Sequence, residues 1–253
     1  MKKIIILSLL VISSSAYAEY YVGGSLDFVF GQKFTNMTNI ENLNYPQPSS
    51  PSNPAIAGGT ITPVNFQNTA GASLKVGKYF DSIPSLGVEL AFNYNKIKMG
   101  NDWVSVTNPA YTTYPGWTGG TTLTEYQQSV SGNLFQFALN GLYRYQDKDS
   151  KFEPYIGAGP TLNYMRLYGT GQSAITATDP VGVSGPAVNS SSNTVGINAF
   201  VGVMYDIGDS YKLGLQYKYN WVPFTIQNFR SSNRITGDYY MNTLGVQLTK
   251  SFN

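Results

Sequence analysis

Hydrophobic and polar residues alternate along much of the chain, and the segment near residue 252 shows the pattern most clearly. One face of that segment carries Tyr240, Leu244, Val246, Leu248 and Phe252, with Asn242 and Lys250 as polar exceptions. The other face carries Thr243, Gly245, Gln247, Thr249 and Ser251. A period of two residues predicts a β-strand with one apolar face and one polar face.

The same alternation predicts eight strands, at about 20–30, 70–80, 85–98, 128–146, 152–168, 194–206, 211–224 and 239–252. Each is at least as long as the roughly 9–11 residues that a tilted membrane strand needs. Short connections at 81–84, 147–151 and 207–210 alternate with long polar ones near 31–69, 99–127, 169–193 and 227–238. The sequence therefore predicts an all-β fold, an eight-stranded antiparallel up-and-down transmembrane β-barrel with three short periplasmic turns and four long extracellular loops.

Charged residues of the predicted strands share the phase that faces away from lipid. They are Asp27, Lys75, Glu89, Arg144, Glu153, Asp206, Lys212 and Lys218. An eight-stranded barrel is just wide enough for side chains to fill, and buried charges need partners. We therefore expect a salt-bridged lumen, with Lys75, Glu89 and Arg144 at its middle. An ion path or proton relay is the alternative, although an anion pore would show a surplus of inward bases.

The first residues have the pattern of a secretory signal peptide. Lys2 and Lys3 precede an apolar run, and Ala16-Tyr17-Ala18 is a small-residue cleavage site. We expect a cleaved signal over 1–18 and an outer-membrane barrel over 19–253.

Composition excludes several function classes. The 253-residue chain contains no Cys and no His, so thiolate metal sites, thiol chemistry and histidine catalysis are all excluded. Without Lys2 and Lys3, 14 basic residues face 14 acidic ones, and nucleic-acid binding has no support. We expect no metal, no cofactor and no enzymatic activity. A catalytic pair of Asp27 and Glu89 is the alternative to their role as salt-bridge partners.

The long loops are the expected seat of binding, because loops on a rigid scaffold carry function. The second loop holds the aromatic residues Trp103, Tyr111, Tyr114 and Trp117. Exposed aromatics among small polar residues resemble a binding surface. Packing of the loop on its own side chains is an equal alternative. Arg230 and Arg234 in the last loop are candidates for contact with lipopolysaccharide phosphates.

Several short motifs resemble those of small outer-membrane barrels of the OmpA-like and Opa-like type, also called porin-family or surface-antigen proteins. They are Tyr20-Tyr21-Val22-Gly23-Gly24-Ser25, Gly87-Val88-Glu89-Leu90, Glu153-Pro154-Tyr155-Ile156-Gly157-Ala158-Gly159 and the near-terminal Phe252.

The resemblance implies a Gram-negative outer membrane, contact with outer-membrane lipid and lipopolysaccharide, and insertion by the barrel-assembly machinery. It also implies a surface-exposed role in adhesion to host-cell or matrix ligands, or in envelope structure. A narrow OmpW-like channel for small or apolar solutes is the alternative.

Overall fold

The computed structural model describes residues 19–39, 60–61, 63–99, 102–107, 122–147, 149–175, 179–184, 188–227 and 234–252. Within them the chain forms twelve strands: β1 (Tyr20–Asn39), β2 (Thr60–Ile61), β3 (Val64–Asn65), β4 (Thr69–Phe80), β5 (Ile83–Lys98), β6 (Asp102–Thr107), β7 (Thr122–Arg144), β8 (Phe152–Ile175), β9 (Asp179–Ser184), β10 (Val188–Gly208), β11 (Tyr211–Gln227) and β12 (Arg234–Phe252). No helix in these ranges is both long and apolar enough to cross a membrane.

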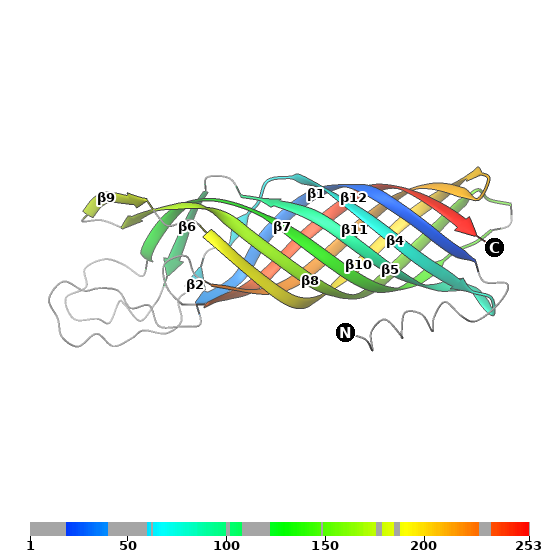
Figure 1. The fold of residues 1–253 in the computed structure, drawn as a ribbon, viewed down its shortest axis with the longest axis horizontal. Coiled ribbons are helices and arrows are strands. Elements are labelled where there is room, and N and C mark those ends of the chain that lie inside the picture. The colour runs from blue at the N-terminus through cyan, green and yellow to red at the C-terminus, as the bar shows by residue number, and fades with distance from the viewer. Residues whose placement is uncertain are drawn as a thin grey trace.

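Eight of the twelve described strands close into a ring of antiparallel neighbours, in the order β1, β4, β5, β7, β8, β10, β11 and β12. The ring closes where β12 pairs with β1, from Tyr20 opposite Phe252 to Asn39 opposite Ile235. Figure 1 shows the strands running obliquely around one long barrel. The predicted eight-stranded up-and-down barrel is confirmed.

Tight turns join strands at the end of the barrel where β1 begins and β12 ends. β10 and β11 are joined at Gly208, Asp209 and Ser210, which have φ values of 95°, 53° and 66°. Positive φ at two consecutive turn residues matches the right-handed twist of a hairpin. Because short turns of such barrels face the periplasm, this end is the periplasmic one.

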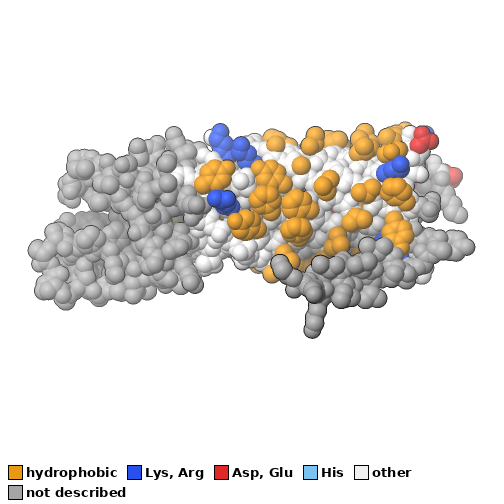
Figure 2. Space-filling view, viewed as in Figure 1, with side chains coloured by type: hydrophobic (Ala, Val, Ile, Leu, Met, Phe, Trp, Pro, Cys, Tyr) orange, Lys and Arg blue, Asp and Glu red, His pale blue; other side chains and the backbone are white. Residues whose placement is uncertain are grey.

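Apolar side chains cover the outside of the barrel between the two rims. Leu26 and Leu74 are 76% and 68% exposed, and they face outward as predicted. Figure 2 shows the apolar side chains as a band across the face of the barrel in view. On β1 the band runs from Tyr20 to Phe30, which spans about 25 Å for a strand tilted by roughly 40°. This height matches the hydrocarbon layer of a bilayer.

The strands continue well beyond this band on the extracellular side. β8 continues from Tyr164 to Ile175, and β1 continues to Asn39. The predicted loop boundaries were therefore too wide, because β1, β7, β8, β10, β11 and β12 all extend into residues expected to be loop. Where side chains are described, the outward residues of these extensions are polar, as at Lys33, Ser191 and Asn193, so they lack the outward apolar phase that marked the membrane strands.

A bulge at Gly31 reverses which face of β1 points inward. The register with β12 shifts between Phe30 and Lys33, and Gly31 has a φ of 58°. A glycine in this region is the usual first residue of a G1 bulge. Val29 is buried before the bulge, whereas Gln32 and Phe34 are buried after it.

Candidate functional site

The inner face of the barrel has three levels. A cluster of ion pairs fills the periplasmic end, buried charges among neutral polar side chains fill the middle, and apolar side chains fill the extracellular end. The alternation of each strand sets which residues point inward, because successive side chains leave opposite faces.

Four charged residues form a closed ionic cluster at the periplasmic end. The Arg144 guanidinium lies 2.5 Å from the Glu19 carboxylate, and the Lys212 ammonium lies 2.8 Å from that of Glu153. Two longer contacts complete the cluster, Arg144 to Glu153 at 3.8 Å and Lys212 to Glu19 at 3.5 Å. Arg144 also lies flat over the Tyr79 ring, at 3.5 Å from its centroid. Two acids and two bases therefore neutralise one another inside the barrel.

Glu19 sits immediately before β1 and is held on three sides. Burial opposes its ionisation, but the hydrogen bond from Arg144 and the charges of Lys212 and Arg144 outweigh that effect, so its pKa is lowered. The Ser251 hydroxyl donates a further hydrogen bond to it, at 2.9 Å. Glu19 is thus an ionised anchor between β1, β7, β11 and β12.

Lys75 and Glu89 form the next layer and pair with each other, whereas Arg144, which the sequence also placed at the middle, lies in the periplasmic cluster. The charged groups of Lys75 and Glu89 are 3.7 Å apart, and both side chains are almost fully buried. Glu89 also accepts hydrogen bonds from the Tyr21 hydroxyl at 2.8 Å and from the Asn140 amide at 3.0 Å. Lys75 donates to the Gln247 side-chain oxygen. Each charge is therefore solvated by several protein groups, as burial of an ion requires.

Three predicted members of the charge network behave differently from the rest. Lys218 and Asp27 are inward and buried, but each is bonded to a neutral partner. Lys218 donates to the Asn93 side-chain oxygen at 2.7 Å, and Asp27 accepts from the Ser25 hydroxyl at 2.7 Å. The prediction for Asp206 is wrong. Its side chain is exposed at the β10–β11 turn, where it accepts the Gly208 backbone N–H at 2.8 Å. Asp206 keeps the alternation of β10 and lies opposite Lys212, but it is at the rim of the barrel, where water reaches it.

Aromatic rings inside the lumen lie on glycines of neighbouring strands. A Cβ added at Gly77 would come within 2.3 Å of the Tyr21 ring, and one at Gly202 within 2.5 Å of the Tyr155 ring. The glycines thus provide the space that these two tyrosines occupy. Tyr21 is held against Glu89, while Tyr155 accepts hydrogen bonds from Gln216 and Gln247.

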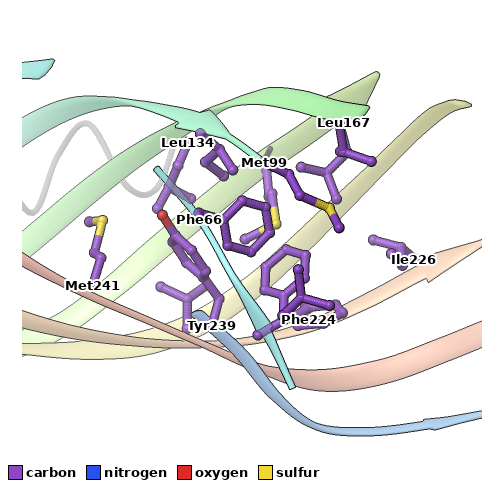
Figure 3. Packing of buried hydrophobic residues seen from close by; sticks show 14 of the residues in the cluster. Phe66, Met99, Leu134, Leu167, Phe224, Ile226, Tyr239 and Met241 are labelled. Atoms are coloured by element: carbon purple, nitrogen blue, oxygen red, sulfur yellow. The ribbon is translucent and has the colours of Figure 1, made fainter. Parts of the chain in front are cut away.

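A cluster of apolar side chains closes the extracellular end of the lumen. Phe34 packs against Phe66, Phe224 and Tyr239, with ring centroids 4.6, 4.4 and 5.3 Å apart. Figure 3 shows Phe66, Phe224, Tyr239 and their neighbours converging within the ring of strands. We call these residues the extension core: Val29, Phe34, Met37, Val64, Phe66, Ile97, Met99, Val130, Leu134, Met165, Leu167, Val222, Phe224, Ile226, Ile235, Tyr239 and Met241.

One small cavity is lined by described residues of the lumen. This cavity of about 30 Å³ lies between the ionic cluster and the Lys75–Glu89 pair, with Glu19, Glu89 and Tyr155 among its lining residues. This volume suits one or two water molecules and no larger solute. No group of three or more possible metal ligands occurs within the part of the chain that the structure describes.

The aromatic loop candidates are mostly beyond the described ranges. Trp103 lies in β6, of which only the backbone path is described, opposite Gln127 of β7. Tyr111, Tyr114 and Trp117 lie outside the described residues, and so does Arg230. Their role in binding remains a prediction.

Sequence reasoning missed two parts of this interior. The sequence predicts no role for Glu19 beyond the first residue after a signal peptide, although its position one residue before β1 keeps it on the barrel wall. The extension core was also missed, although Ile97, Met99, Leu134 and Met165 continue the inward phase of their strands. Their apolar character at inward positions was the available signal.

Comparison with known proteins identifies the family. A family model described as Opacity family porin protein matches residues 97–241, which is more than half of the chain. No curated protein matches the chain.

Solved structures of outer-membrane proteins resemble the fold. The protease OmpT from Escherichia coli is 10% identical with a TM-score of 0.56, and the match covers 92% of this chain and 97% of that one. OprG from Pseudomonas aeruginosa is 15% identical with a TM-score of 0.48, and the match covers 93% of this chain and 96% of that one. Neisserial surface protein A is 13% identical with a TM-score of 0.44, and the match covers 92% of this chain and 97% of that one. At 10% identity the likeness to OmpT shows the barrel fold alone. The barrel, its outward apolar band and the matching family model together show that the chain belongs to the Opacity family porin proteins of the Gram-negative outer membrane.

Proposed function

We propose that this protein is a non-enzymatic surface protein, which holds its extracellular loops above the membrane for adhesion to host-cell or matrix ligands. The observation that carries the proposal is the reversal of polarity along the strands. Leu134 faces inward and Asn133 outward just above the membrane band, whereas Gln136 faces inward and Phe137 outward within it.

This reversal makes the extracellular extension a folded body with its own core. Burial of an apolar side chain contributes about 1.5–3 kcal/mol, so the extension core stabilises strands that no lipid surrounds. The part of β8 beyond Tyr164 adds a further height of roughly 25 Å at the rise and tilt of a membrane strand. A rigid platform of this kind suits the presentation of loops to another surface, and it is not needed to span the bilayer.

The interior favours this proposal over the channel alternative. The ionic cluster, the Lys75–Glu89 pair and the extension core each occupy a level of the lumen. We therefore expect purified, refolded protein to give no stepwise conductance in planar bilayers. Regular conductance steps in wild type would favour the narrow channel.

Catalysis by the inward carboxylates is disfavoured by their contacts. Glu89 is held by Tyr21, Asn140 and Lys75, and Asp27 is bonded to Ser25. Small barrels related to this family are mostly non-enzymatic, although OmpT is a protease by its name. The chain has no His for the proton transfers that hydrolysis usually needs.

Adhesion is tested with two loop deletions expressed on the cell surface. Deleting 108–117 removes Tyr111, Tyr114 and Trp117 but keeps β6, and deleting 40–59 shortens the first loop. We expect both to keep heat-modifiable migration on detergent gels, because loop length costs little free energy. Attachment to host cells or matrix should fall for at least one of them.

A core variant with intact loops is the matched control for the platform. Leu134→Ala should loosen the extension and reduce attachment partly, without changing any loop residue. Equal attachment by wild type and by both loop deletions would discard adhesion, and an envelope-structural role would then lead.

A further inference from the structure

A row of basic and amide side chains lies directly above the outer aromatic residues on one face of the barrel. Tyr94 of β5, Phe135 of β7 and Tyr164 of β8 are register partners and form one row. In the next row outward, Lys96, Asn133 and Arg166 are partners in the same three strands. Lys98 follows two residues beyond Lys96 on the same face of β5.

These side chains can reach a common ligand. Neighbouring strands are about 4.8 Å apart, so the Cα atoms of Lys96 and Arg166 are separated by roughly 10 Å, with Asn133 between them. Lys96, Lys98 and Arg166 are exposed and point away from the lumen, while Ile97 and Leu167 beside them are buried inside. Flexible side chains of this length easily close such a gap around a single anionic group.

The charges of this row are available to a ligand. The ion pairs among the described residues involve Lys75, Arg144 and Lys212 as their bases, and none involves Lys96, Lys98 or Arg166. Asn133 is oriented by Tyr94, whose hydroxyl donates to its side-chain oxygen at 2.9 Å. That bond leaves the amide NH₂ of Asn133 as the group that can donate to an anion.

The two rims of the barrel differ in charge. Exposed acids gather at the periplasmic rim, namely Asp81, Asp147, Asp149, Asp206 and Asp209. On the extracellular side, Asp238 has a described side chain, which is already bonded to Asn36 and Trp221, whereas the side chains of Asp102, Glu125 and Asp179 lie outside the described ones. Figure 2 shows Lys and Arg side chains at the extracellular edge of the apolar band. Lys96, Lys98 and Arg166 therefore lie at the extracellular membrane interface, at the depth of lipid head groups, whereas the exposed acids are at the periplasmic one.

We propose that Lys96, Lys98, Asn133 and Arg166 form a binding site for the phosphate groups of lipopolysaccharide in the outer leaflet. Lysine and arginine are the usual partners of phosphate, and the amide adds a neutral donor between them. The row of Tyr94, Phe135 and Tyr164 just below lies where the sugar backbone of the lipid passes into its acyl chains. The site holds one lipid against β5, β7 and β8.

Binding is measured on the refolded barrel in neutral detergent, with bisphosphorylated lipid A as the probe. The test variant is Lys96→Gln with Arg166→Gln. The matched control is Lys151→Gln with Lys250→Gln, which removes the same charge from the periplasmic rim. We expect the test variant to bind lipid A at least tenfold more weakly, equivalent to about 1.4 kcal/mol, and the control to bind like wild type.

Three ligand arms define the source of the phosphate. Dephosphorylated lipid A and phosphatidylglycerol should each bind at least tenfold more weakly than lipid A, and millimolar inorganic phosphate should not displace it. Equal binding of either lipid, displacement by inorganic phosphate, or equal losses in the test and control variants would overturn the proposal.

A second variant keeps every cation and so separates the site from general charge attraction. Asn133→Asp has nearly the same volume and can still accept from Tyr94, but it places a negative charge between Lys96 and Arg166. We expect lipid A binding to be lost while heat-modifiable migration stays normal. Unchanged binding by this variant would also overturn the proposal.

Discussion

Removing the carboxylate of Glu89 should destabilise the barrel strongly. In Glu89→Ala, the Lys75 ammonium stays buried at 6% exposure without its counter-ion, which typically costs about 3–5 kcal/mol. Two facts place the effect at the lower end of that range. The pair is separated by 3.7 Å, and Gln247 still accepts a hydrogen bond from Lys75.

The other losses at Glu89 are part of the same cost. The Tyr21 hydroxyl and the Asn140 amide each lose an acceptor, and an unsatisfied buried donor costs about 1–3 kcal/mol. Because these groups form one network, their costs overlap and do not add. Glu89→Gln keeps an acceptor for Tyr21, so it should cost less than Glu89→Ala.

Urea unfolding in lipid vesicles, followed by tryptophan fluorescence, measures the effect. With a slope of about 3 kcal/mol per molar urea, the midpoint of Glu89→Ala should fall by about 1–2 M. The double variant Lys75→Met with Glu89→Leu should recover much of the loss, because an apolar pair leaves no buried charge. A wild-type midpoint for Glu89→Ala, or a double variant that is less stable than Glu89→Ala, would refute a buried charge network here.

Three further predictions test other levels of the fold. Because the pKa of Glu19 is lowered below its ordinary value of 4.5, its stabilisation is present above that value and is lost as pH falls through the lowered pKa. The difference in unfolding midpoint between wild type and Glu19→Gln should therefore shrink on acidification from pH 7 to about pH 3, and a constant difference would contradict the ionic role. Leu26→Arg on the lipid face should cost about 2–4 kcal/mol by urea titration, whereas Gln67→Arg on the extension should cost about 0.5 kcal/mol or less. Gly77→Ala should cost about 1–3 kcal/mol through its clash with Tyr21, and a Tyr21→Leu background should reduce that cost in a double-mutant cycle.

The membrane part of the fold was predictable because lipid imposes a strict alternation. Leu26, Leu74 and Phe137 all face outward as the period of two required, and Lys75 and Glu89 meet inside. The signal is strong because every outward position faces lipid and every inward position faces a crowded polar lumen. Each position of a membrane strand therefore favours either an apolar or a polar side chain, and not both.

Beyond the membrane the same rule misleads, because the solvent outside the barrel changes from lipid to water. Lys33 outside and Phe34 inside follow the ordinary pattern of a soluble protein, so the outward apolar phase that marks a membrane strand is absent and the sequence predicts a loop there. On β1 the bulge at Gly31 adds a second obstacle, since it reverses the phase before Phe34. Contacts such as that of Arg144 with Glu19 could not be predicted either, because they depend on how far the strands are staggered around the ring.

The seam between β1 and β12 sets an order on assembly. Glu19 arrives with the first strand and Ser251 with the last, and they bond to each other across the seam at 2.9 Å. Until that seam forms, Arg144 lacks the carboxylate 2.5 Å from its guanidinium, and a half-built sheet would carry this cation poorly compensated toward a hydrocarbon environment. Closure of the seam therefore fixes in the barrel wall a carboxylate that Arg144 uses beside its longer contact with Glu153.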